Sequence, residues 1–493
     1  MEIQLKKNST TPLYKQIRNT IRSQILSGQL SDGFKLPSER QLVEKLGVHR
    51  NTVKKAYEML IHEGLVYASA KAPRGYFVRN SPSEVKPDGK PDTRKAFSSL
   101  DKNFNYHFLG TQNTFQRLYN SSYLSDSISF AGVLVNKETL PLPYLHEIMD
   151  EITSGDDLEP FWFCDPQGTE RMRACLASLL FGRKIYVQPQ NIQIITETYE
   201  ALSNIAFMYL KEGDFAIVEE PVMPAIVNIL LHTGAHVLFV PVEKDGIQIE
   251  ILENLVERYR PKLIYSMPNF HNPSAAVMSL EKRKRLLQCA LSHNIPIVED
   301  DSLFDFNYSG ITLPSLYSMD RTNSVIYIDS FNLSFFPGAR VGYIVAPDNV
   351  IKTYRRIVNK DQMFLNSLSQ YMWARFFEKG YYEKHRQFLI DFYRKKRDLM
   401  CSALSLIPGL SFSVPDGGLV IWIRLPEYTN DRQIAAAAER TGLLLMPGNT
   451  FFCRGQPWRV LYPGLLFLCH GRRNHRGVPA HGRGPEFLPD LTK

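Results

Sequence analysis

The sequence predicts an α/β protein in two parts. The first part is a small N-terminal helical module with a β-hairpin. The second is a large domain built on a mostly parallel sheet, with a smaller α+β domain behind it. Three observations lead to this expectation. Short β-branched runs alternate with helical patterns through the middle of the chain, the net charge is confined to the first 80 residues, and a Pro-, Ser- and Lys-containing stretch separates the two parts.

The size and composition are those of an ordinary globular protein. The 493 residues allow two to four domains, and the chain is 44% hydrophobic and 22% charged. No run reaches the ~18–20 apolar residues of a membrane span, and the start lacks the apolar stretch of a signal peptide, so we expect a cytoplasmic protein. The six cysteines lie far apart without a C-x-x-C pair, which matches neither a disulfide framework nor a zinc site.

The positive charge is unevenly distributed. Residues 1–80 hold 14 Lys and Arg against 6 Asp and Glu, a net charge of +8, whereas the rest of the chain holds 44 of each sign. A basic module joined to a neutral domain is typical of nucleic-acid-binding proteins, although a solvated basic surface gives the same balance.

The order of the predicted elements sets the domain boundaries. Residues 80–105 contain Pro, Ser, Lys and Asp without an apolar period, which predicts a linker. After it we expect strands and helices in alternation, with strands at residues 191–196, 215–220, 236–242, 262–267, 295–300 and 324–330, and helices from Tyr199, at 225–232 and at 281–292. Residues 352–406 are largely helical in pattern, and strands at 411–414 and 419–425 follow. The predicted domains are residues 1–79, the linker, residues 106–468 and a tail of residues 469–493.

The basic module has the pattern of a helix–turn–helix. In the first predicted helix, Leu13, Ile17, Ile21 and Ile25 recur at i+4 and form one apolar face. Ser38 can cap a second helix, whose inward residues are Leu42, Val43 and Leu46, and Gly47 supplies the turn. A third helix begins near His49, with inward positions Val53, Tyr57 and Leu60.

This arrangement leaves polar residues at the start of the third helix, where a recognition helix enters the major groove. Arg50, Asn51 and Thr52 lie in its first turn, and Arg is suited to a guanine edge while Asn and Thr can contact bases or phosphates. Residues 65–80 then predict two short strands, a wing whose Arg74 could reach the minor groove.

The segments LPSER, LGVHRNTV, AYEMLIHEGLV and RGYFV resemble the winged helix–turn–helix of GntR-type bacterial repressors across almost all of residues 8–80. The resemblance implies DNA contacts at the residues that match the family's contact positions, which are Ser38, Arg40, Arg50, Asn51, Thr52 and Gly75.

The large domain resembles the fold-type-I aminotransferases, from about Phe130 to Gly455. The matching motifs are DPQG (165–168), EEPVMP (219–224), MPNFHNPS (267–274), EDDS (299–302), SFNLSFFPGARVGY (330–343) and MPGNTFF (446–452). Joined to the basic module, this domain identifies the chain as similar to the MocR subfamily of GntR regulators. In that fold a lysine forms a Schiff base with pyridoxal phosphate, so the resemblance implies a pyridoxal-phosphate-type pocket.

Four residues of this pocket match the family. Asp300 stands at the partner of the pyridinium nitrogen, Asn272 at the partner of the ring hydroxyl, and Ser330 and Arg340 beside the phosphate.

Five other positions depart from the family pattern. The Schiff-base lysine is replaced by Leu333, and no lysine occurs between residues 285 and 351. The other departures are Glu197 for the phosphate-cradle glycine, Met223 for the ring-stacking tyrosine, Ser302 for the tyrosine after the two aspartates, and Tyr462 for the substrate-carboxylate arginine. Since leucine is no nucleophile, we expect no covalent attachment of the cofactor and no transamination.

The retained polar residues then need another role. A buried Asp and Arg are paired, hydrogen-bonded or bound to a ligand, and we expect a non-covalent effector with an anionic group on Arg340. Because Glu197 disfavours a dianion, a monocarboxylate is expected rather than a phosphate, with an amino acid or a vitamer among the candidates. The alternative is that Arg340 and Asp300 pair with neighbouring side chains.

The C-terminal tail is rich in Gly, Pro, Arg and His and has no apolar period, which predicts a disordered basic segment that a frameshift could have produced. His470, His475 and His481 fit no ligand spacing, so we expect no metal site.

The predicted function is therefore a dimeric, DNA-binding transcriptional regulator whose aminotransferase-like domain senses a small molecule and is not an enzyme. Two half-sites of double-stranded operator DNA are the expected partner of the dimer. The alternatives are a regulator that still binds pyridoxal phosphate, an active aminotransferase carrying a DNA-binding domain, and a decayed regulator without function.

Overall fold

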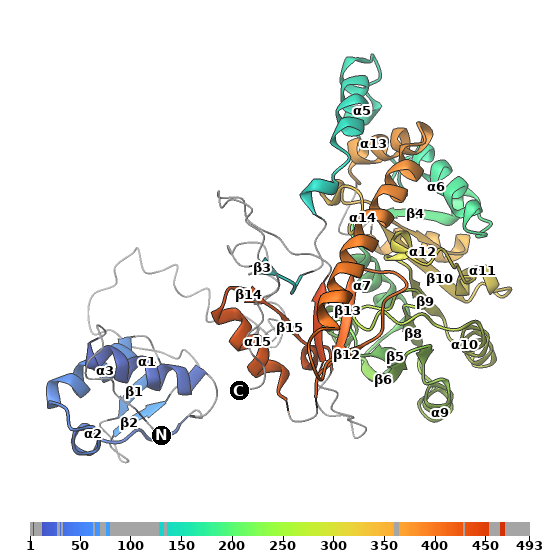
Figure 1. Ribbon diagram of the computed structural model, residues 1–493. Helices are drawn as coiled ribbons and strands as arrows, with labels where there is room; N and C mark the ends of the chain where they lie inside the picture. The colour runs from blue at the N-terminus through green and yellow to red at the C-terminus, as the bar shows by residue number, and fades with distance from the viewer. Residues whose placement is uncertain are drawn as a thin grey trace, which may run out of the picture. The chain divides into compact units, whose positions relative to one another are not determined.

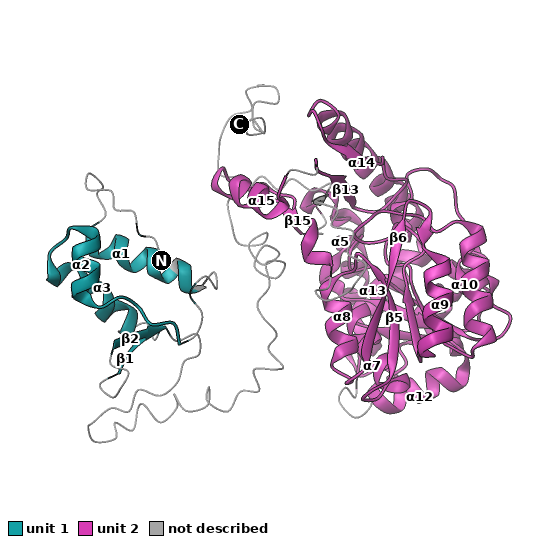
Figure 2. Ribbon diagram, turned by 90° about the horizontal axis from the view of Figure 1, so that it is seen from below, with its two compact units in different colours: residues 1–104 teal, residues 105–493 magenta. Residues whose placement is uncertain are grey.

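A computed structural model describes residues 12–26, 33–62, 65–69, 75–78, 128–132, 136–358, 364–426, 429–452 and 464–468, together with residues 3 and 30. The chain divides into two compact units, residues 1–104 and residues 105–493, which Figure 2 shows in teal and magenta. The predicted linker and the predicted C-terminal tail lie outside the described residues, and so does Arg74.

The described residues of the N-terminal unit form three helices and a two-stranded antiparallel sheet, as the sequence predicts. Figure 1 shows its elements in blue: α1 (Leu13–Leu26), α2 (Glu39–Leu46), α3 (Arg50–His62), β1 (Val66–Ser69) and β2 (Gly75–Val78). Every position predicted to point inward is buried or half-buried in one apolar cluster, which joins the three helices to both strands. The apolar i+4 pattern therefore identified this core correctly.

The second helix is bounded at both ends by capping interactions. The Ser38 hydroxyl accepts a hydrogen bond from the Gln41 amide (3.3 Å), and the Gln41 side chain accepts one from the Ser38 amide (2.9 Å), which forms a capping box. Gly47 ends the helix in the left-handed region (φ 61°), and its amide donates to the Val43 carbonyl (2.9 Å). The turn between α2 and α3 is therefore well defined by local sequence.

The second unit is built on an eight-stranded sheet in the order β4-β11-β10-β9-β8-β5-β6-β7. The strands are β4 (Ile192–Ile195), β5 (Phe215–Glu220), β6 (His236–Glu243), β7 (Gly246–Ile247), β8 (Leu263–Ser266), β9 (Ile297–Asp300), β10 (Val325–Ser330) and β11 (Gly342–Val345). The five strands from β10 to β6 in this order are mutually parallel, whereas β11 is antiparallel to both of its neighbours. All six strands predicted from the β-branched runs are present.

Helices cover both faces of this sheet. The helices on one face are α7 (Thr198–Tyr209), α8 (Pro224–Leu231) and α12 (Asp348–Val358), and those on the other are α9 (Ile249–Tyr259), α10 (Leu280–Ser292) and the short α11 (Leu316–Met319). Within β5, Val218 packs in the first layer and Ile217 in the second, because successive strand residues point to opposite faces. This double cover explains why the strands are almost continuously apolar.

A third cluster packs around the β4–β11–β10 end of the sheet. Its helices are α5 (Leu142–Ser154), α6 (Glu170–Gly182), α13 (Ser367–Glu378) and α14 (Tyr381–Leu404). Short 3-10 turns connect the larger elements, namely η2 (Lys137–Thr139), η3 (Glu159–Phe161), η4 (Pro189–Asn191), η5 (Phe304–Phe306), η6 (Pro337–Ala339) and η7 (Gly448–Phe451).

The smaller α+β domain predicted behind the sheet is also present. Its four-stranded sheet is antiparallel and consists of β12 (Ser411–Phe412), β13 (Val420–Arg424), β16 (Gly464–Leu468) and β15 (Met446–Pro447), in that order. The helix α15 (Asp431–Arg440) precedes β14 (Leu443–Leu444), which pairs in parallel with the distant β3 (Ile128–Ser129). This last pairing joins segments more than 300 residues apart, and no local pattern predicts it.

Candidate functional site

The first turn of α3 presents the residues predicted to contact DNA. Arg50 and Asn51 are exposed, Thr52 is half-buried, and the Arg50 side chain is 76% exposed. Its Nε lies 3.2 Å from a Glu39 carboxylate oxygen, and the Tyr76 hydroxyl donates to the other oxygen (2.7 Å). The Tyr76 hydrogen bond is the largest cause of the lowered pKa of Glu39. Since exposed ion pairs contribute at most about 1 kcal/mol, Glu39 orients Arg50 without withholding it from a stronger anion.

The other predicted DNA contacts surround this turn. Arg40 is 91% exposed and pairs only loosely with Glu44 (3.4 Å), whereas the Ser38 hydroxyl serves as the helix cap. Gly75 begins β2 with φ +151°, where a Cβ would lie 3.0 Å from the Lys35 side chain, so the strand approaches residue 35 closely. The geometry of the unit therefore groups the described candidates at the start of α2, the start of α3 and the wing.

The four pocket residues predicted in the large domain gather at one edge of the sheet. Asp300 ends β9 and Ser330 ends the neighbouring parallel strand β10, while Arg340 lies just before β11, whose Gly342 pairs with Ser330. Asn272 lies in the loop that follows β8, the strand beside β9. This edge carries the carboxyl ends of the parallel strands, where ligands bind in open α/β sheets.

Asp300 is buried and its carboxylate is fully engaged by the protein. One oxygen accepts from the Tyr265 hydroxyl (2.8 Å), and the other accepts from the Ser302 amide (3.0 Å) and hydroxyl (2.5 Å). Burial raises the pKa of Asp300, and the negative charge of Glu197 adds to this effect. Ser302 thus helps to hold the Asp300 carboxylate, which the family resemblance predicts as the partner of a pyridinium nitrogen.

Asn272 and Ser330 show less engagement. Ser330 is buried, and the Asn272 side-chain oxygen is buried without a hydrogen-bond partner among the described residues. A buried acceptor without a donor is costly, so Asn272 is the member of this group best placed to accept a hydrogen bond from a bound molecule.

Arg340 forms an ion pair with Glu197, which the family resemblance predicts to stand in place of a phosphate-cradle glycine. The two side chains are 50% and 31% exposed. Glu197 is also the N-cap of α7, and its other carboxylate oxygen accepts from the Thr198 amide (3.0 Å) and hydroxyl (3.2 Å). Arg340 therefore has a protein carboxylate as its partner in this structure.

Leu333 lies in the loop after β10 and is partly buried against the third apolar cluster. Its neighbours in the loop anchor this segment, since Phe331 and Phe336 each stack on Trp373 with ring centroids 4.3 Å apart. Met223 is partly buried as well and packs against two apolar clusters. Tyr462, the other residue at which the chain departs from the family, lies outside the described residues.

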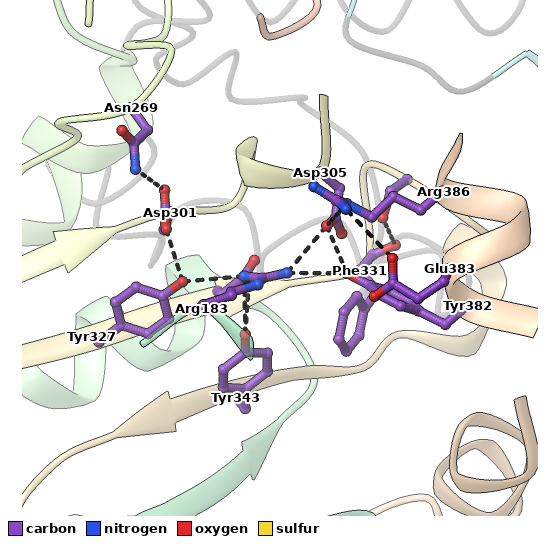
Figure 3. Close-up of polar contacts among 12 residues, drawn as sticks. Arg183, Asn269, Asp301, Asp305, Tyr327, Phe331, Tyr343, Tyr382, Glu383 and Arg386 are labelled. Carbon is purple, nitrogen blue, oxygen red and sulfur yellow. Dashed lines mark hydrogen bonds and ion pairs between the residues drawn. The ribbon is translucent and has the colours of Figure 1, made fainter. Parts of the chain in front are cut away.

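A buried polar network centred on Arg183 was not expected from any sequence pattern (Figure 3). The Arg183 side chain is 6% exposed and donates to Asp329 (2.8 Å) and Asp305 (3.1 Å). Three hydroxyls lie between 3.0 and 3.5 Å from the same guanidinium, those of Tyr327, Tyr343 and Tyr382. Because these residues come from the end of α6, from β10, β11 and η5, and from α14, the network fastens the sheet to the long helix.

A second carboxylate adjoins this network. Asp301 accepts from the Tyr327 hydroxyl (2.8 Å) and from the Asn269 side chain (2.8 Å), as Figure 3 shows, and burial raises its pKa to about 7. The paired acidic residues at 300–301 were the available sequence signal, but only the first of them was interpreted as functional.

A group of exposed aromatic and aliphatic side chains lies at η3 and before α13. We call it the aromatic patch: Leu158, Phe161, Trp162, Phe163 and Phe364, which are 46–74% exposed. Trp162 and Phe163 contact each other edge to face (5.5 Å), and the Phe163 ring lies 4.4 Å from that of Phe364. Clustered apolar side chains of this size mark an interaction surface.

Two absences apply to the described residues alone. Within them, no helix is both long and apolar enough to span a membrane. No three His, Cys, Asp or Glu side chains are grouped as metal ligands in the same part of the chain, and the three tail histidines lie outside it.

Comparison with known proteins accounts for both units. Residues 145–465 match the family "Aminotransferase class I and II", and residues 13–78 match "Bacterial regulatory proteins, gntR family". The chain is 26% identical over 420 residues to "Uncharacterized HTH-type transcriptional regulator YisV" of Bacillus subtilis, with 85% of each chain covered. It is 26% identical over 456 residues to "Probable rhizopine catabolism regulatory protein MocR" of Rhizobium meliloti, covering 92% of this chain and 90% of that protein.

Among solved structures, the kynurenine aminotransferase of Pyrococcus horikoshii superposes with a TM-score of 0.70 at 26% identity, covering 76% of this chain and 93% of the enzyme. The sheet and its helical layers are thus those of an aminotransferase fold, and the N-terminal unit has the fold of a gntR-family DNA-binding head. The chain belongs to the aminotransferase class I and II family and carries a gntR-family head, the combination found in MocR-type transcriptional regulators.

Proposed function

We propose that this MocR-type regulator binds operator DNA through α3, dimerises through its aminotransferase-like domain, and responds to a small molecule that it holds without a covalent bond. It performs no transamination. A ligand that binds one arrangement of the dimer better than another shifts the balance between arrangements and thereby changes operator affinity. A bacterial regulator meets its operator in the cytoplasm, which is the proposed place of action.

The observation that carries the proposal is Leu333. Transamination on this fold needs an amine that condenses with the cofactor aldehyde, and the residue that matches the family's lysine has a hydrocarbon side chain. No lysine occurs from residue 285 to residue 351 that could take its place. Leu333 packs against the apolar cluster that also contains Phe331 and Trp373, so its environment suits a hydrocarbon.

The residues present do not fit pyridoxal phosphate as the family holds it. The phosphate would need a small residue at the start of α7 and an available Arg340, but Glu197 stands there and pairs with that arginine. Asp300 already accepts three hydrogen bonds from the protein. Of the four pocket residues that match the family, only Asn272 has a buried side-chain oxygen without a partner among the described residues.

The proposal is tested by mixing the purified protein with pyridoxal phosphate and recording its absorption spectrum before and after borohydride reduction. We expect no aldimine band between about 410 and 430 nm and no covalent adduct by mass spectrometry, because no amine is placed to form one. The Leu333→Lys variant provides the matched control, since it restores an amine at this position alone. A reducible band and a covalent adduct in the wild type would refute the non-covalent assignment.

The DNA-binding part is tested separately, by protection of a promoter near the gene in a footprinting experiment. We expect two protected half-sites related by the symmetry of the dimer. A soluble, dimeric protein that protects no such site would favour a decayed regulator instead.

A further inference from the structure

We propose that Glu197 is a built-in anion: its carboxylate occupies the phosphate position of the aminotransferase fold and restricts the pocket to ligands that carry no phosphate group. The inference rests on the proposed function only in taking this pocket as the ligand site. The inference concerns whether the ligand of this pocket carries a phosphate group. Its test does not depend on DNA binding or on transamination.

The Glu197 carboxylate accepts hydrogen bonds from donors of the kind that bind phosphate. One oxygen accepts from the backbone amide and the hydroxyl of Thr198, and the other accepts from the Arg340 guanidinium and, at 3.5 Å, from the Asn332 side-chain amide. A helix N-terminal amide, a hydroxyl and an arginine are the groups with which proteins hold phosphate. In this chain one side-chain carboxylate takes all of them.

Glutamate is an unusual residue at the N-cap of a helix, and Glu197 occupies that position in α7. Ser, Thr, Asp, Asn and Gly are preferred at the N-cap, and Glu is not among them. Capping of α7 therefore does not explain Glu197, whose side chain turns back to the Thr198 amide and extends to Arg340. The ion pair with an arginine 143 positions away does explain it.

The charge of Arg340 is already balanced by the charge of Glu197. Between residues 322 and 351, Arg340 is the only Lys or Arg, and Glu197 neutralises it. The buried Asp300 lies close enough to Glu197 for the two charges to interact, and the Asn332 side-chain oxygen is a buried acceptor without a partner in the described structure. A phosphate dianion at this position would meet the Glu197 carboxylate and a buried acceptor, while Arg340, the one cation of residues 322–351, is already paired. A ligand with a neutral or donor group at this end suffers no such repulsion.

The experiment compares phosphorylated and unphosphorylated probes on the full-length protein by isothermal titration calorimetry. Pyridoxal phosphate and pyridoxal differ only in the phosphate group, and inorganic phosphate reports on the anion position alone. We expect neither phosphate compound to bind the wild type at millimolar concentration. The Glu197→Gly variant should bind both at least about tenfold more tightly, because Gly keeps the cap, frees Arg340 and opens the start of α7.

Three further variants control the result. Glu200→Gln removes one negative charge from the same helical turn without touching Arg340, and it should leave phosphate affinity as in the wild type. Arg340→Ala added to Glu197→Gly should abolish the gain. Glu197→Gln, which keeps the volume but not the charge, serves if the glycine variant does not fold, and it should bind phosphate more tightly than the wild type but less tightly than the glycine variant.

Several results would overturn the proposal: tight phosphate binding by the wild type, no gain in either Glu197 variant, an equal gain in Glu200→Gln, or a gain that survives the loss of Arg340. Failure of DNA binding or the appearance of transaminase activity would count against the proposed function. The phosphate affinities of the variants could still be compared in either case.

Discussion

Arg50 and Lys54 lie one helical turn apart on α3, and we expect Arg50 to contact a base edge and Lys54 to contact the DNA backbone. Arg50 is in the first turn, where a recognition helix reaches base edges, whereas Lys54 lies further along and pairs loosely with Glu58 (3.7 Å). We expect Arg50→Ala to cost about 1–3 kcal/mol on the specific operator and to relax the preference at one base pair. Lys54→Ala should weaken specific and random DNA about equally and lower the salt dependence of binding.

The dissociation constants for the footprinted operator and for a scrambled duplex are measured by fluorescence anisotropy. Glu39→Gln is an informative third variant, because it removes the carboxylate that orients Arg50 but no DNA-facing donor. If Arg50→Ala loses as much affinity for scrambled DNA as for the operator, Arg50 contacts the backbone and another residue reads the sequence.

At the residue scale, local sequence predicted interactions within a few residues better than contacts between distant segments. Ser38 was expected to cap α2 and does so, since a cap depends on residues three positions apart. The partner of Arg340 was left open, because Glu197 lies 143 residues away and only the sheet order brings the two together. Arg183 was missed altogether: a single arginine after an apolar helix looks like a solvated helix end, and its burial follows from long-range packing.

At the element scale, Ser38 offers a test that separates capping from DNA contact. Ser38→Ala removes the capping box and should destabilise α2 by about 1 kcal/mol, whereas Ser38→Asp retains a cap acceptor but places a negative charge near DNA phosphates. Hydrogen exchange of the α2 amides reports the first effect, and operator affinity reports both. We expect Ala to speed exchange and Asp to leave it slow while weakening DNA binding. Unchanged exchange in the alanine variant would show that the cap contributes nothing.

His385 gives α14 a sensitivity to acid. It packs against Phe335, its Nε2 has no partner in the described structure, and burial lowers its pKa to about 4. An unfolded histidine titrates near pH 6.5, so between about pH 6.5 and 4 the unfolded chain binds a proton that the folded chain does not. This residue therefore contributes a loss of folding stability as the pH falls through that window.

The contribution of His385 is isolated by comparing urea unfolding of the wild type and of His385→Phe at pH 7.5 and pH 5. The variant should lose less stability on acidification, and His146→Gln, which removes an exposed histidine from α5, should behave as the wild type. Buried carboxyl groups such as Asp301, whose pKa is raised to about 7, act in the opposite sense, so the difference between variants is the quantity to measure. An equal acid loss in wild type and His385→Phe would assign the effect to other groups.

The type of each element was easier to predict than its direction. Six β-branched runs were predicted as strands and are strands, because the double helical cover demands apolar residues on both faces. The antiparallel β11 between β4 and β10 was not anticipated, since nothing in GYIV distinguishes a parallel neighbour from an antiparallel one.

At the scale of the whole molecule, the aromatic patch bears on the proposed dimer. Trp162 and Phe163 are 67% and 60% exposed in the single chain, and water contact of such surface is unfavourable unless a partner covers it. We expect the double variant Trp162→Ser, Phe163→Ser to be monomeric in sedimentation velocity experiments. Its affinity for an operator with two half-sites should fall by about 10²-fold or more, because the second head loses its tether to the first.

A second exposed aromatic pair provides the matched control. Phe181 and Tyr186 are 67% and 72% exposed and contact each other edge to face (5.3 Å), but they lie at the other end of α6 from the patch. Changing both to Ser removes a similar apolar area and should leave the protein dimeric, with wild-type operator affinity. If this control dissociates and the patch variant does not, the dimer forms through the far end of α6. If neither variant dissociates, exposed aromatic side chains do not hold the dimer together.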